Sequence, residues 1–156
     1  GFSFKRKIVT GFLVAYFFLQ VIVPMRSWFF PGNVFWTEEG YRLSWKMMLR
    51  TKSGRIYFKV RDPASGKTWI DDPKSKFSPA LVMWIAICPD ISWQYAQRLK
   101  NDYALKRIPN VEVYAIGSVS LNRGKPAPVI DSTVNLSDTR WYAFRHSPWI
   151  TKTNSP

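Results

Sequence analysis

The amino-terminal apolar run, Ile8 to Val23, constrains this chain more than any other feature of its sequence. Its sixteen residues carry no charged side chain. A helix of this length covers roughly 24 Å, somewhat less than the roughly 30 Å hydrocarbon core of a bilayer. The apolar stretch continues through Pro24 and Met25 into aromatic residues, which supplies the missing length. We therefore predict a transmembrane helix. Its predicted lipid-anchoring residues are Ile8, Phe12, Tyr16, Phe17, Leu19 and Val23.

Basic and aromatic residues flank the predicted span on opposite sides. Three basic residues precede it, and such a cluster favours the cytoplasmic side of a membrane. Three aromatic residues follow it, where an interfacial belt would lie. We expect a single-pass protein of the cytoplasmic (inner) membrane with its amino terminus in the cytoplasm. Residues 1–30 are then the cytoplasmic stub and the span, residues 31–150 a periplasmic domain, and residues 151–156 a flexible tail. The predicted interface anchors are Lys5, Arg6, Lys7, Trp28, Phe29 and Phe30.

Three other interpretations of the apolar run remain open. A cleaved signal peptide also has a basic start and an apolar core, but this run is longer than usual and Pro24-Met25-Arg26 is a poor cleavage site. A buried core helix would need a larger soluble partner than the remaining chain offers. Because Gly1 is not an initiator methionine, the run could also be the last of several spans in a longer protein.

The composition beyond the span limits the classes of function. The chain has 23 basic and 10 acidic residues, a net charge of +13. This surplus suits an anionic lipid surface, an acidic protein partner or nucleic acid. Nucleic acid would lie on the other side of the membrane in the predicted orientation, so we do not expect it as a partner. A single cysteine, Cys88, permits no internal disulfide, which a bacterial extracytoplasmic domain tolerates. Its apolar neighbours favour a buried thiol over a nucleophile.

Alternating polarity predicts strands in the first half of the domain. Residues 43–50 alternate cleanly, residues 51–54 resemble a hairpin loop, and residues 55–61 alternate again. After a turn, residues 67–70 form a short third strand. These segments predict a three-stranded antiparallel meander. The residues predicted to face inward are Leu43, Trp45, Met47, Leu49, Ile56, Phe58 and Val60.

Helices and a further strand are predicted in the second half. Ser78-Pro79 is typical of an N-cap and first helical residue, for a short helix ending near Ile87. Pro89 begins a longer helix that ends near Lys106. Residues 111–121 alternate as a strand, and the aromatic segment 141–150 is expected to dock on the sheet. The predicted class is α+β: one amino-terminal transmembrane helix followed by a β-rich, antiparallel, sandwich-like extracytoplasmic domain with one or two helices.

Few residues combine into a catalytic or metal-binding pattern. The chain has one histidine, His146, so no second imidazole is available for a metal site or a triad. Glu38 and Glu39 are adjacent, and neighbours in sequence point in different directions, which favours a turn or helix-start role over an acid–base pair. Gly124-Lys125 lacks the spacing of a phosphate-binding loop. The span contains no histidine to ligate a heme or chlorophyll. We expect no catalytic residue, no metal site and no cofactor.

Two stretches resemble a known family. The first, PGNVFWTEEGYRLSWKMMLR followed by DPASGKTW, is similar to the extramembrane domain of the vitamin K-dependent gamma-carboxylase family and its bacterial relatives. The second, IDSTVNLSDTRWYAFRHSPWI, is similar to the family's closing pattern of an aspartate and then spaced Trp, Phe and Trp. The similarity covers nearly everything after Arg26. The residues that carry it are Trp36, Glu38, Glu39, Trp45, Asp131, Trp141, Phe144 and Trp149.

The resemblance implies a β-rich domain on the lumenal or periplasmic face, of the kind that contacts polypeptide substrates in the family. The family's enzymes carry a multi-span membrane half with a catalytic lysine, and this chain has one predicted span, so no catalytic residue is carried over. We expect a non-catalytic accessory subunit that docks on a larger membrane protein complex, with respiratory or photosynthetic complexes as candidate hosts. The alternative is the carboxy-terminal portion of a carboxylase-like membrane enzyme, in which Glu38 and Trp45 shape a substrate channel. A third hypothesis is that the basic domain binds anionic or quinone-level lipid.

Overall fold

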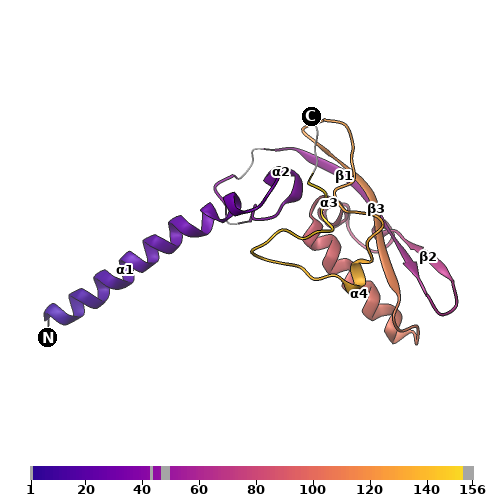
Figure 1. Cartoon of the computed structure of the whole chain (residues 1–156), viewed down its shortest axis with the longest axis horizontal. Coiled ribbons are helices and arrows are strands. Elements are labelled where there is room, and N and C mark those ends of the chain that lie inside the picture. The colour runs from indigo at the N-terminus through magenta and orange to yellow at the C-terminus, as the bar shows by residue number, and fades with distance from the viewer. Residues whose placement is uncertain (1, 43, 47–49, 153–156) are drawn as a thin grey trace.

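A computed structural model describes residues 2–42, 44–46 and 50–152 of the chain. The amino-terminal helix α1, Phe2–Met25, projects away from the rest of the molecule and continues into a short 3₁₀ helix, η1, Arg26–Phe29 (Figure 1). A 26-residue stretch, Phe4–Phe29, is long and apolar enough to cross a membrane, and none of its tested window is buried against the domain. Within the described part of the chain it is the one such helix.

The core of the domain is a three-stranded antiparallel sheet with strand order β2-β1-β3. The strands are β1, Lys52–Arg61, β2, Thr68–Asp71, and β3, Glu112–Leu121. Every residue of β1 pairs with β3, while β2 pairs only with the last four, from Phe58 to Arg61. The inward positions of β1 predicted from the sequence are buried, and the opposite face is partly exposed, as is usual for an antiparallel sheet with one solvated face.

The predicted meander is wrong in its first strand. Residues 44–46 and 50 lie outside any strand, and positions 43 and 47–49 lie outside the described residues. The edge of β1 that this segment was expected to occupy is taken by β3, whose alternation was also predicted. The loop predicted at residues 51–54 is wrong as well, because Lys52, Ser53 and Gly54 lie within β1. Gly54 pairs with Val119 so closely that a Cβ there would come within 2.8 Å of the valine side chain.

Two helices cover the buried face of the sheet (Figure 1). They are α3, Pro79–Ile87, and α4, Pro89–Leu105, and both begin with proline as predicted. The Tyr95 ring from α4 packs edge-on against Phe58 of β1, with ring centroids 4.9 Å apart. The α+β class is therefore confirmed. The sandwich-like detail is corrected, because in the described residues helices, rather than a second sheet, face β1 and β3.

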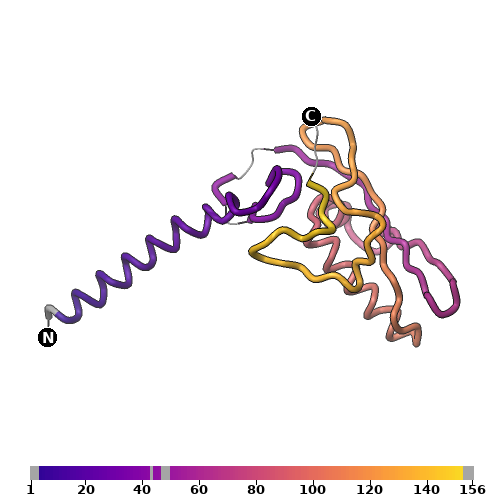
Figure 2. Tube along the Cα trace, in the orientation of Figure 1, coloured from indigo at the N-terminus to yellow at the C-terminus, as the bar shows by residue number. Residues whose placement is uncertain are grey.

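The carboxy-terminal segment returns across the domain after β3. Ala127 bridges to Val119, and Ile130 bridges to Ile150. Trp149 and Ile150 are buried in the core, which agrees with the prediction that the segment 141–150 packs on the sheet. Between them and the short helix η3, Leu136–Asp138, the chain forms a long loop on the side from which α1 projects (Figure 2). This loop departs from the docking prediction, because it extends away from the sheet.

Candidate functional site

A cleft of about 410 Å³ lies where α1 meets the domain. Four segments converge there: the start of η1, the turn after the short helix α2 (Val34–Thr37), the first turns of α4, and the carboxy-terminal loop. We call it the membrane-proximal cleft. Its lining residues are Arg26, Phe30, Glu38, Glu39, Gly40, Arg42, Asp90, Gln94, Trp141, Tyr142 and Ala143.

The turn that follows α2 sends its two glutamates in different directions. The Asn33 side chain caps the helix by accepting a hydrogen bond from the Phe35 amide at 2.9 Å. Glu38 then adopts a left-handed conformation with φ of 61°, and Gly40 follows with φ of 69°. A Cβ at Gly40 would lie 2.7 Å from the Phe30 ring, so only glycine fits this turn without displacing the ring. The turn thereby directs Glu38 toward β1 and Glu39 toward the carboxy-terminal loop.

Glu38 lies in a buried ion-pair cluster. Arg50 Nη2 lies 2.5 Å from Glu38 Oε1, and Lys52 Nζ lies 3.2 Å from the same oxygen. The Lys52 side chain is 0% exposed, and its ammonium also donates to the carbonyl oxygens of Trp36 at 2.6 Å and Ile87 at 2.8 Å. Burial raises the pKa of Glu38 and lowers the pKa of Lys52, while the attraction between the two charges opposes both shifts. The cluster therefore links α2, β1 and α3 through one lysine.

Glu39 is fully buried and holds the carboxy-terminal loop. Its Oε2 lies 2.5 Å from His146 Nδ1, and its Oε1 accepts a hydrogen bond from the Ser147 amide at 2.7 Å. Both carboxylate oxygens are thus occupied by residues more than a hundred positions later in the chain. The pair Glu38 and Glu39, predicted as a turn element, forms a turn whose two carboxylates join separate parts of the fold.

The third acid of the cleft is also paired. Asp90, near the start of α4, lies 2.8 Å from Arg42 Nη2. The Arg42 carbonyl in turn accepts a hydrogen bond from Arg26 Nη2 at 3.0 Å, which connects the residue after α1 to the domain. Each of the three acids that line the cleft therefore contacts a neighbouring arginine, lysine or histidine side chain. The arrangement is suited to holding the surrounding segments together, and it leaves arginine and aromatic side chains at the rim.

Other chemistry-bearing residues do not add a reactive centre. Cys88 is buried, and this burial raises the pKa of its thiol to about 12, which removes the thiolate needed for nucleophilic attack at neutral pH. Asp131 accepts hydrogen bonds from the Thr133 amide and hydroxyl, as in a turn. In the described ranges, no group of three or more His, Cys, Asp and Glu side chains is placed to hold a metal ion.

The remaining residues singled out in the sequence occupy different environments. Trp36 is buried in the core, and the Trp141 and Trp149 rings lie with centroids 6.0 Å apart and planes tilted by 54°. Trp45 and Phe144 are exposed, as are Trp28 and Phe29. Phe30, expected at the membrane interface, is only 6% exposed because it packs against Gly40. The predicted lipid-anchoring residues in α1 are exposed along the helix except Val23, which is half-buried near its end. Lys5, Arg6 and Lys7 lie in the first turns of α1.

Sequence reasoning missed the partners of the two glutamates. The sequence predicts a loop at Lys52, leaves Arg50 out of the inward face of the strand expected at residues 43–50, and predicts no partner for His146. A lysine at the start of an alternating strand, in an inward register with Ile56, was the one signal for burial. The pairing of Glu39 with His146 had no local signal, because it depends on a contact between the two ends of the domain.

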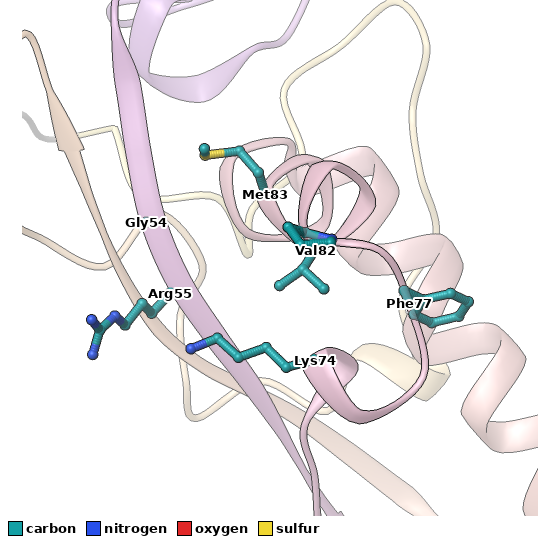
Figure 3. Close-up of a pocket in the computed structure, with 7 residues that line it drawn as sticks. Gly54, Arg55, Lys74, Phe77, Val82 and Met83 are labelled. Carbon is teal, nitrogen blue, oxygen red and sulfur yellow. The ribbon is translucent and has the colours of Figure 1, made fainter.

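A second pocket, of about 370 Å³, lies between β1 and α3 (Figure 3). Val82 and Met83 line its helix side, and Lys74, from the short helix η2 (Pro73–Ser75), extends its amino group toward β1. Arg55 also lines the pocket, but its side chain extends to the other side of the strand, away from the helix. Phe77 and Pro79 complete its apolar wall. It is separate from the membrane-proximal cleft, because the two share no lining residue.

The fold and the cleft define a class of protein: an α+β domain carried on an apolar helix long enough to cross a membrane. The sequence model of the vitamin K-dependent gamma-carboxylase lumenal domain matches residues 5–155. The chain therefore belongs to this lumenal-domain family. The match includes α1 as well as the domain, and so extends beyond the resemblance recognised after Arg26. No solved structure matches the chain.

Proposed function

We propose that this chain is a non-catalytic, single-span accessory subunit whose lumenal-type domain docks on and stabilises a larger membrane protein complex. In this proposal α1 crosses a bacterial cytoplasmic membrane with its amino end inside, and the domain lies in the periplasm. The basic cluster before the apolar run supports this orientation. Respiratory and photosynthetic complexes remain candidate hosts.

The observation that carries the non-catalytic part is the pairing of the acids in the cleft. Glu38, Glu39 and Asp90 are each held by a basic partner within 3.2 Å. A general acid or base needs a proton-accepting group that can reach the substrate. In this cleft the carboxylates are already engaged in bonds that stabilise the fold, which favours a binding role over turnover.

Exposed apolar side chains on α3 support docking. The helix buries Val82 and Ile85 against the sheet but leaves Leu81, Met83 and Trp84 exposed to solvent. Large aromatic and methionine side chains of this kind are enriched at protein interfaces. The exposed Trp45 adds a further ring outside the core. We propose that the α3 face contacts a membrane-protein partner.

Purification from native membranes in mild detergent tests the proposal. The tagged chain is expected to copurify with partner subunits at a fixed stoichiometry. A Met83→Glu and Trp84→Glu double variant is expected to lose this association, because it places charge in the apolar contact. Leu105→Glu is the matched control, since Leu105 is 85% exposed and lies at the last residue of α4. A monodisperse lone chain in detergent contradicts the proposal.

The carboxy-terminal portion of a gamma-carboxylase-like membrane enzyme is the second candidate. The observation in its favour is that the family match runs continuously through α1 and the domain, which treats the helix as part of the family unit. In this case the membrane-proximal cleft would face an upstream membrane-embedded half. An antibody against the domain separates the candidates: a band near the 18.2 kDa of this chain supports the accessory subunit, and a much larger band supports the enzyme.

A further inference from the structure

We propose that residues 140–146 form a second membrane anchor, a loop that places the Phe144 ring among the lipid headgroups of the leaflet from which α1 emerges. We call it the foot loop. Its sequence, RWYAFRH, has two arginines and no acid. The inference rests on α1 lying in a membrane, which is part of the proposed function, and does not depend on docking to a protein partner.

The position of the foot loop points to the membrane. It extends on the side of the domain from which α1 projects (Figures 1 and 2). The Arg26 guanidinium lies 5.8 Å from the centre of the Phe144 ring. Arg26 is the first residue after α1 and lies three residues before the end of the apolar stretch Phe4–Phe29, so its charged group belongs near the membrane surface. Phe144 is thereby placed at the level where the membrane meets water.

The exposure of Phe144 distinguishes it from the other rings of its segment. Its side chain is 78% exposed, close to the values for Trp28 at 71% and Phe29 at 78%. Trp28 and Phe29 follow the apolar helix directly, where aromatic rings are favoured by the bilayer interface. Trp149, five residues after Phe144, is buried in the core. Exposed rings from two distant parts of the sequence therefore lie on, or in contact with, the short segment Arg26–Phe29 that follows α1.

The charge around Phe144 fits an anionic lipid surface. Arg140 and Arg145 are exposed on the foot loop, and the Arg145 guanidinium lies 3.7 Å above the centre of the Tyr142 ring. Arg42, across the cleft, has a side chain that is 63% exposed. Basic residues beside interfacial aromatic rings strengthen binding to membranes that contain anionic lipids. This charge complementarity favours lipid headgroups as the occupant.

Hydrogen bonds at both ends hold the foot loop in place. At its carboxy-terminal end Glu39 contacts His146 and accepts from the Ser147 amide. At its amino-terminal end the Trp149 indole donates to the Arg140 carbonyl at 3.4 Å. Glu39 belongs to the turn that packs on Phe30. The same turn therefore contacts both the foot loop and the segment that follows α1. The loop is therefore preorganised to meet the same surface as α1.

Fluorescence quenching of the full chain in lipid vesicles tests the inference. Phe144→Cys is labelled with an environment-sensitive dye and placed in vesicles of phosphatidylcholine and phosphatidylglycerol containing a headgroup-attached nitroxide. The native Cys88 does not compete for the label, because its thiol is buried. Leu105→Cys, at the last residue of α4, is the matched control, and Phe12→Cys within α1, read with an acyl-chain nitroxide, reports insertion of the helix.

The expected result is quenching at position 144 at least about twofold stronger than at position 105, with position 12 quenched by the acyl-chain nitroxide. Equal quenching at 144 and 105, with position 12 still quenched, overturns the foot loop while leaving the α1 anchor standing. Loss of quenching at position 12 overturns both. A label at position 144 that is protected from water in native membranes, but not in lipid vesicles that contain this chain alone, assigns the loop to a protein partner. That result also overturns the lipid contact.

Discussion

Replacing Lys52 with methionine removes the residue on which the buried charge cluster depends. Its ammonium is completely buried, lies 3.2 Å from Glu38, and donates to the carbonyl oxygens of Trp36 and Ile87. Methionine fills a similar volume but offers neither charge nor donors. The substitution therefore tests the polar contacts of the lysine with little change in packing.

The expected cost follows from what the substitution leaves behind. Breaking a buried ion pair by removing one partner costs about 3–5 kcal/mol, because the other charge remains buried. Arg50 still contacts Glu38, which limits this loss, but two carbonyl oxygens lose their donor, at about 1–3 kcal/mol each. We expect Lys52→Met to lower the free energy of unfolding by about 3–5 kcal/mol, enough to lower Tm by about 10 °C or more.

Urea unfolding of the detergent-solubilised chain, followed by tryptophan fluorescence, measures this loss. Lys125→Met is the control, since Lys125 is exposed and should tolerate the change within about 0.5 kcal/mol. The Glu38→Gln and Lys52→Met double variant should lose less than the sum of the single losses, because the two residues contact each other. A loss for Lys52→Met no larger than that of the control refutes the reasoning.

Three further results are expected. Cys88 should resist thiol reagents at pH 8 until the chain unfolds. A pKa of about 12 leaves roughly one thiol in ten thousand ionised, against about one in ten at the ordinary pKa of 9.0. Rapid labelling of the native chain would show that the thiol is accessible and contradict this prediction. Gly117→Ala should destabilise the sheet by at least about 2 kcal/mol, because its Cβ would lie 2.3 Å from the Arg55 carbonyl oxygen; unchanged thermal unfolding would contradict this. Glu39→Gln should speed amide hydrogen exchange at Ser147, and unaltered protection there would mean that the Glu39 carboxylate does not hold the loop.

The sequence predicted the elements with strong local signals. Ser78-Pro79 and Pro89 marked the starts of α3 and α4, and alternation located the second half of β1 and all of β3. The pairing of these strands was harder to predict, because β2, a short 3₁₀ helix, α3 and α4 separate β1 from β3 in the sequence. An alternating pattern identifies the buried face of a strand but not its neighbour in the sheet.

The site was harder to predict than the fold for a related reason. Glu38 and Glu39 were recognised as a turn, and the φ values of Glu38 and Gly40 agree with that interpretation. Their partners come from β1 and from the carboxy-terminal loop, and ion pairs between distant segments leave no periodic trace in a sequence. The family resemblance was confirmed by the match over residues 5–155, but it names a domain and not the contacts that this domain makes.

Photo-crosslinking from position 84 in native membranes tests the central claim most directly. A photoreactive amino acid replaces Trp84 on the exposed face of α3, and a second variant carries it at Leu105 as the control. Docking on a membrane complex predicts one adduct of defined mass from position 84, absent from position 105 and identified as an integral membrane protein. A folded, membrane-bound chain that yields no adduct from position 84, or the same adducts from both positions, would contradict the account.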